Sequence, residues 1–226
     1  MDRPAVTAPP FIQRYRAHFD ETWSETASID RVRFVVLDSE TTGLNPATDR
    51  IVTIGAISVV DAEIWLGDSF AALLKVTHNT CAVTVHGVTR DQSVRGVEEP
   101  QALERFLEYL RDGIIVGHHI GHDIEALNAA TERHWGIRLL NRSLDTMDLT
   151  LHLERANAFA GQAPMRRFTL DALCEKFGVV PHDRHTAAGD AFITAQVFLR
   201  LLRLASRFDR ATLGRICEPF PVEGAA

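Results

Sequence analysis

The segment FVVLDSETTGL, residues 34–44, is the stretch that decides the fold. Its first four residues, Phe34 to Leu37, form an apolar run that is typical of a buried strand. Asp38 and Glu40 follow, and side chains at positions i and i+2 of a strand point to the same side of the sheet. Two carboxylates held this close raise each other's pKa unless a positive charge lies between them. We therefore expect a core strand that ends in two acids and needs a counter-ion.

The composition fits one large globular domain, or one domain with appendages. The chain has 226 residues, of which 46% are hydrophobic. Its net charge of −6 argues against a protein that coats nucleic acid, but it is compatible with acids that hold metal ions. Cys81, Cys174 and Cys217 lack paired metal-binding spacing, so reduced and mostly buried thiols are expected. No apolar run approaches the roughly 20 residues of a membrane span, and the start MDRPAVTAPP lacks a signal-peptide core, which predicts a cytoplasmic protein.

The apolar pattern on both sides of the opening segment predicts strands that later alternate with helices. Further strands are expected at residues 50–60, within 64–76, at 114–118 and near 143–145, and helices at 100–112, 121–135, 149–156, 169–178 and 190–205. The short link VDAE between the second and third strands is typical of a hairpin turn, so these two strands are expected to be antiparallel. This order favours an α/β sandwich with a mixed sheet.

The two ends of the chain differ from the middle. Residues 1–30 are predicted to be an N-terminal helical appendage, because Phe11, Tyr15, Phe19 and Trp23 recur every four residues. This aromatic stripe either packs on the protein's own core or docks a partner. Residues 206–226 are expected to be a C-terminal tail.

Three places in the sequence put acids beside an apolar element. Asp38 and Glu40 end the first strand, Asp123 opens a helix just after a strand, and Asp190 lies near the start of a helix, five residues after His185. Each acid alone has a plainer explanation, as a solvated turn residue or as a partner of the helix dipole. Together they can meet at one edge of a sheet, where α/β proteins form their sites. Such carboxylates suit Mg²⁺ or Mn²⁺, a pair of these ions clamps a phosphoryl displacement, and a histidine takes the proton of the attacking water.

Three motifs resemble those of the DEDDh 3′–5′ exonucleases, the ribonuclease H-like family that includes the proofreading epsilon subunit of bacterial DNA polymerase III. They are DSETTGL at 38–44, the GHH…HD segment at 117–123 and HTAAGD at 185–190. Three further segments also occur in the order that the family has them: HGVT at 86–89, LDT at 144–146 and TLDALCEKFGV at 169–179. The resemblance covers residues 31–205, the expected exonuclease domain. It implies a three-layer ribonuclease H-like sandwich with a mixed five-stranded sheet flanked by helices.

The resemblance also implies roles for individual residues. It makes Asp38, Glu40, Asp123 and Asp190 the acids that hold two divalent cations, Mg²⁺ or Mn²⁺, and His185 the general base. It places these residues at the substrate: Thr41, Thr42, Leu44, His86 and His118. The implied reaction releases 5′-mononucleotides from the 3′ end of single-stranded nucleic acid, with DNA favoured over RNA.

Two residues depart from the family pattern, and two other functions remain open. His119 stands where the family usually has Asn, and His122 stands where it usually has Phe; both leave the acid set intact.

One alternative is a proofreading or adaptor subunit whose main role is docking to a DNA polymerase or another replication or repair partner. A remote alternative is an HD-type phosphohydrolase, which is all-helical, suggested by His122-Asp123 and His182-Asp183.

Overall fold

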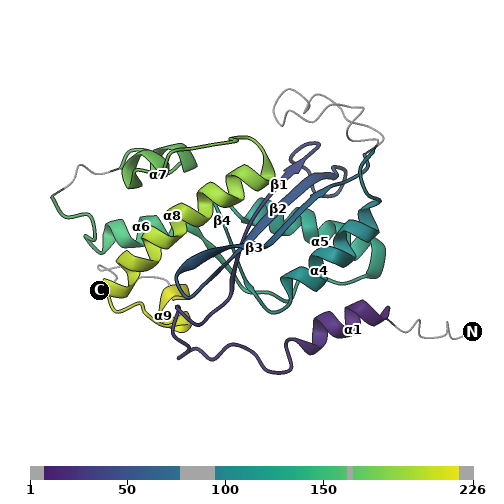
Figure 1. Cartoon of the computed structure of the whole chain (residues 1–226), viewed down its shortest axis with the longest axis horizontal. Coiled ribbons are helices and arrows are strands. Elements are labelled where there is room, and N and C mark those ends of the chain that lie inside the picture. Colours follow the sequence, from purple (N-terminus) through teal and green to yellow (C-terminus); the bar gives the residue numbers. More distant parts are fainter. Residues whose placement is uncertain (1–7, 77–94, 162–164, 219–226) are drawn as a thin grey trace, which may run out of the picture.

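The computed structural model describes residues 8–76, 95–161 and 165–218, and these form a mixed five-stranded sheet between layers of helices (Figure 1). The strand order is β3-β2-β1-β4-β5, with bounds β1 Phe34–Thr41, β2 Ile51–Val60, β3 Glu63–Leu73, β4 Ile114–Gly117 and β5 Ser143–Asp145. Strand β1 pairs antiparallel with β2 and parallel with β4. The predicted fold class is confirmed. The sheet also contradicts the all-helical HD-type alternative.

Strand β1 lies at the centre of the sheet, and both of its faces are buried. Phe34 and Val36 belong to one core cluster, with α6 Thr146–Arg155, α7 Leu170–Phe177 and α8 Ala187–Arg207. Val35 and Leu37 belong to the other cluster, with α4 Glu99–Leu110 and α5 Gly121–Trp135. This double burial explains the unbroken apolar run, because neither face of the strand meets water.

The acids lie inside β1 rather than at its end. The strand continues to Thr41, and the ladder pairs Asp38 with Gly55 and Glu40 with Thr53 of β2. The expectation that the strand ends at the acids is therefore wrong. Backbone hydrogen bonds to β2 hold both acidic residues in the sheet, so their positions are as rigid as the sheet itself.

The second and third strands form the predicted antiparallel hairpin. Asp61 and Ala62 in its turn have φ values of 53° and 56°. Two consecutive positive φ values are the mark of a type I′ turn, whose twist matches that of the flanking strands. The VDAE link therefore correctly indicated a hairpin turn, although it contains no glycine.

The N-terminal helix is shorter than the aromatic spacing suggested. Helix α1 runs from Pro10 to Ala17, so Phe19 and Trp23 lie beyond its end. Phe11 and Tyr15 are buried, and the Phe11 ring meets the Trp135 ring edge-on at 4.9 Å. The Trp23 indole donates a hydrogen bond to the Asp112 carbonyl at 3.1 Å. These aromatic residues pack on the protein's own chain, which is the first of the two interpretations of the stripe.

The residues after α8 form a short helix, α9 Leu213–Cys217, where only a tail was expected. Leu213 and Ile216 are buried in the same core cluster as Ile29, and Ser28 bridges to Thr212. Both Cys174, which is buried, and Cys217 are free thiols, while Cys81 lies outside the described residues. Of the helices in the described ranges, none is long and apolar enough to cross a membrane.

Candidate active site

Three carboxylates meet where β1 passes the start of α8. Oxygens of Asp38, Glu40 and Asp190 all lie within 4.8 Å of one another. Asp38 and Glu40 share the face of β1 that looks toward α8, as their i, i+2 spacing predicted. Among the described residues, no other group of three or more acid, histidine or cysteine side chains comes this close together.

The start of α8 is fixed by its own capping residue. The Thr186 hydroxyl accepts a hydrogen bond from the Gly189 amide at 3.1 Å and donates one to the Asp183 carbonyl at 2.7 Å. Asp190 therefore falls in the first turn of the helix and is buried at 7% exposure. A carboxylate is favoured there because the helix dipole is positive at its N-terminus.

Gly55 lets α8 approach the sheet at the site. It pairs with Asp38 in the ladder, and a Cβ at this position would lie 2.4 Å from backbone atoms of Ala187 and Ala188. The helix backbone thus rests directly on the backbone of β2, which brings Asp190 to Asp38. The sequence analysis did not identify Gly55, although a glycine inside a strand often marks a close backbone approach.

Asp123 is not part of this three-acid oxygen cluster. Its Oδ1 accepts hydrogen bonds from the Ser39 amide at 2.8 Å and the Ser39 hydroxyl at 2.7 Å. Ser39 lies between Asp38 and Glu40 and faces the opposite side of the sheet, toward α5. The structure therefore brings three of the four predicted acids into one oxygen cluster and turns the fourth toward Ser39. Ser39 was not predicted, because nothing in its local sequence marks it as a partner.

Three of the four predicted acids have a raised pKa. Burial raises the pKa of Asp38 to about 9, and the neighbouring charges of Asp123, Asp190 and Glu40 add to the effect. Burial, followed by Asp190 and Asp123, raises the pKa of Glu40 to about 7. Burial raises the pKa of Asp123 to about 6 against the lowering effect of its Ser39 bonds. Burial, rather than the mutual repulsion of Asp38 and Glu40 that we expected, is the main cause.

The raised pKa values of these buried acids fit a site for a divalent cation. Buried carboxylate oxygens are the donors that hard cations such as Mg²⁺ prefer, and a bound cation would stabilise their ionised forms. The donor set and the burial of the acidic cluster therefore fit a metal ion.

Arg184 is a second feature that the sequence analysis missed. Its guanidinium forms ion pairs with Asp190 and, at 2.8 Å, with Asp171 at the start of α7. It lowers the pKa of both Asp38 and Glu40, which partly offsets the effect of burial. Arg184 thus supplies the positive charge closest to the acids within the described part of the chain.

His185 lies beside Asp190 through its backbone. Its amide donates to Asp190 Oδ2 at 3.3 Å, and its φ of 62° places it in the left-handed region. The side chain is exposed to solvent. Within the described ranges its imidazole forms no hydrogen bond to an acid, and the exposed ring is accessible to water.

Most of the residues expected to contact the substrate lie in or just after the end of β1. Thr41 and Thr42 brace the turn after β1, with hydrogen bonds from their hydroxyls to the Gly43 carbonyl at 2.7 Å and to Asp49 at 3.1 Å. Leu44 is 84% exposed, which is unusual for a leucine and leaves its side chain open to a ligand. His86 lies outside the described residues.

The histidines of the second motif have different environments. His118 contacts the Thr146 hydroxyl at 3.0 Å, and burial lowers its pKa to about 4, so its ring is neutral at pH 7. His119 is exposed, and the His122 ring lies 3.4 Å from the Thr41 hydroxyl. Asp145 accepts backbone hydrogen bonds from this turn and caps α6, so it orders the chain locally.

Comparison with known proteins identifies the family. Residues 35–198 match RNase_T, which is described as exonuclease. The PolC-type DNA polymerase III of Thermotoga petrophila is 33% identical over 199 residues, which are 85% of this chain but only 14% of the polymerase. The DNA polymerase III epsilon subunit of Aquifex aeolicus is 28% identical over 173 residues, 75% of this chain and 80% of the subunit. E. coli exonuclease I in complex with a dT13 oligonucleotide has a similar fold, with a TM-score of 0.69 and 20% identity over 79% of this chain and 43% of that one. The chain belongs to the exonuclease family, in the DEDD-type 3′–5′ group that its motifs predicted.

Proposed function

We propose that the protein removes 5′-mononucleotides from the 3′ end of single-stranded DNA. The observation that carries this proposal is the cluster of Asp38, Glu40 and Asp190 oxygens within 4.8 Å of one another. E. coli exonuclease I, which has a similar fold, is seen in complex with a dT13 oligonucleotide, and this supports a single-stranded DNA substrate. We favour DNA over RNA on this ground.

The acids of the cluster would hold two divalent cations, Mg²⁺ or Mn²⁺. Asp38, Glu40 and Asp190 provide the shared oxygens, and Asp123 contributes from the α5 side, where Ser39 holds it. When bound, the cations activate water and stabilise the charge that develops on the phosphate. Because β1 and the first turn of α8 hold the acids, little reorganisation is needed on binding.

His185 is the proposed general base. Its exposed imidazole lies on the residue whose amide contacts Asp190, at the open side of the cluster. An imidazole nitrogen can accept the proton of the attacking water. Leu44 would contact the terminal base, with Thr41 and Thr42 positioning the turn that carries it, and His118 and His86 would contact the nucleotide.

A DNA polymerase is the proposed partner of the chain. The relatives named above include one PolC-type polymerase and one epsilon subunit, and the match covers only a small part of the polymerase. Phe11 and Tyr15 are buried against the protein's own helices, so they offer no surface for such a partner. A docking surface must therefore lie elsewhere on the molecule.

A cleavage assay on labelled oligonucleotides tests the proposed function. Matched single-stranded DNA and RNA carrying a 5′ label are incubated with Mg²⁺ or Mn²⁺, and a ladder that shortens from the 3′ end is expected, faster on DNA. Asp38→Asn should reduce the rate at least about 100-fold, as expected for a lost metal ligand. Asp148→Asn, an exposed acid on α6, is the matched control and should cleave normally. Wild-type rates in Asp38→Asn, or products released from the 5′ end, would refute the proposal.

A further inference from the structure

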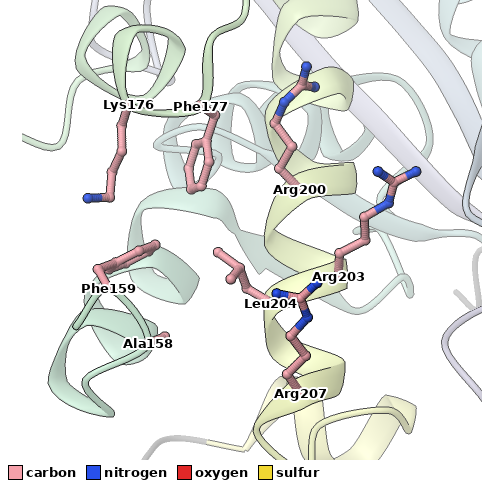
Figure 2. Close-up of a pocket in the computed structure, with 8 residues that line it drawn as sticks. All are labelled: Ala158, Phe159, Lys176, Phe177, Arg200, Arg203, Leu204 and Arg207. Atoms are coloured by element: carbon pink, nitrogen blue, oxygen red, sulfur yellow. The ribbon is translucent and has the colours of Figure 1, made fainter. Parts of the chain in front are cut away.

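A groove runs along the C-terminal half of α8, between this helix, α7 and the turn that follows α6 (Figure 2). Its volume is about 270 Å³. None of the acids of the candidate active site lines it. Arg200, its lining residue nearest the start of α8, follows Asp190 by ten residues, which is about 15 Å along a helix. The groove is therefore a feature separate from the acid cluster.

The rim of the groove is positively charged. Three arginines of α8 and one lysine of α7 line it, and the lining contains no acid: Arg200, Arg203, Arg207 and Lys176. The arginines lie at i, i+3 and i+7, so they share one face of the helix. Among the described residues, none of the three arginines forms an ion pair with a carboxylate. This concentration of positive charge, in a chain with a net charge of −6, points to an anionic ligand.

The floor of the groove is apolar, and the ring of Phe159 in it is covered. Phe159, Phe177 and Leu204 form it. The Lys176 ammonium lies 4.1 Å from the centroid of the Phe159 ring. The centroids of the Phe159 and Phe177 rings are 6.1 Å apart, and the angle between the two ring planes is 59°. Phe159 is only 9% exposed. Bound single strands stack their bases on open aromatic faces, and Lys176 covers the Phe159 ring instead. A bulky apolar side chain, in contrast, needs only a dry surface of this kind.

We propose that this groove binds an acidic peptide segment of a partner protein. Carboxylates of the segment pair with the guanidinium groups of Arg203 and Arg207, whose forked geometry suits them. One bulky apolar side chain of the same segment lies on the floor between Phe159 and Leu204. The proposal goes beyond the proposed exonuclease activity and does not depend on it, because no residue of the groove belongs to the acid cluster.

Fluorescence anisotropy of a labelled peptide tests the proposal on the full chain. The probe is the octapeptide DEDDFLEF. It is compared with a version that carries amides in place of all carboxylates and with a version that carries serine in place of both phenylalanines and the leucine. The protein variants are Arg203→Glu and Arg207→Glu, made singly. Arg105→Glu, an exposed arginine on α4 across the sheet, is the matched control. A labelled dT oligonucleotide in EDTA is titrated in parallel.

The proposal predicts that only the intact octapeptide binds and that added salt weakens it, because the contacts are charged. Arg203→Glu and Arg207→Glu should each raise its Kd at least about fivefold, with Arg105→Glu unchanged and cleavage of DNA unaffected in all three. Absence of peptide binding, equal binding by the charge-reversed variants, or equal binding of the serine version would overturn the proposal. Selective loss of dT binding in Arg203→Glu and Arg207→Glu would instead assign the groove to nucleic acid and overturn it as well.

Discussion

Replacing Asp38 by asparagine should stabilise the metal-free protein at neutral pH. The folded protein holds a proton on Asp38 up to a pKa of about 9, whereas the unfolded chain loses it near its ordinary value of 3.8. At pH 7 folding must therefore protonate a carboxylate whose pKa in the unfolded chain lies about three units below the pH. Each of these units costs about 1.4 kcal/mol. Asparagine has nearly the same shape and no charge, so this cost disappears. We expect Asp38→Asn to gain about 4 kcal/mol as an upper limit, and about half of that if water reaches the carboxylate.

The sign of this effect depends on pH in a defined way. Because the folded state binds more protons than the unfolded state between pH 4 and 9, wild-type stability falls as pH rises through that window. Glu40, with a pKa raised to about 7, adds to the decline between about pH 4.5 and 7. The stability difference between Asp38→Asn and wild type should be near zero at pH 4 and should widen toward pH 9. Addition of Mg²⁺ should stabilise wild type more than the variant, since a cation binds the ionised acids.

Urea unfolding in EDTA at pH 5, 7 and 9, followed by tryptophan fluorescence, measures the difference. Asp148→Asn, whose side chain is exposed, serves as the control and should stay within about 0.5 kcal/mol of wild type at each pH. An Asp38→Asn protein that is no more stable than wild type at pH 7, or a difference that stays constant with pH, would refute the argument that burial of Asp38 raises its pKa.

Three other substitutions probe the support of the site. Gly55→Ala should displace α8, lower cleavage at least about tenfold and cost about 1–3 kcal/mol in urea unfolding, while Gly67→Ala, which meets no atom within 4 Å, should change neither. Ser39→Ala removes one hydrogen bond to Asp123, so an NMR titration should find the pKa of that carboxyl above its present value of about 6; a lower pKa would contradict this account. Arg184→Gln removes the positive charge that lowers the pKa of the neighbouring acids, so the EDTA-treated protein should lose about 1–3 kcal/mol at pH 8, and unchanged stability would show that this charge has no net effect.

Much of the site could be predicted because its parts are local in the sequence. The apolar run before Asp38 identified the central strand, and the i, i+2 spacing placed Glu40 on the same face. Asp190 was placed correctly at the start of its helix, because Thr186 caps that helix three residues before Gly189. The hairpin after the first strand was equally local, since a two-residue turn leaves adjacent strands little choice but antiparallel pairing.

The features that were missed all join residues far apart in the chain. Ser39 and Asp123 are 84 residues apart, and only the packing of α5 beside β1 reveals their hydrogen bonds. The role of Arg184 depends on its ion pairs with Asp171 of α7 and Asp190 of α8, which only the packing of these helices brings together. The aromatic spacing at the N-terminus overestimated α1, because the later rings pack through loops rather than along one helix.

The sequence alone determined which chemistry this chain carries and which strand carries it, since residue types and short spacings decide the donors and the faces on which they lie. The tertiary structure alone decided how close those donors come. The approach of α8 to the backbone at Gly55 sets the distance between Asp190 and Asp38, and the depth of burial sets the pKa values of the acids. Both depend on packing between segments that are distant in sequence, where the free energy of burial and the desolvation of charge act together.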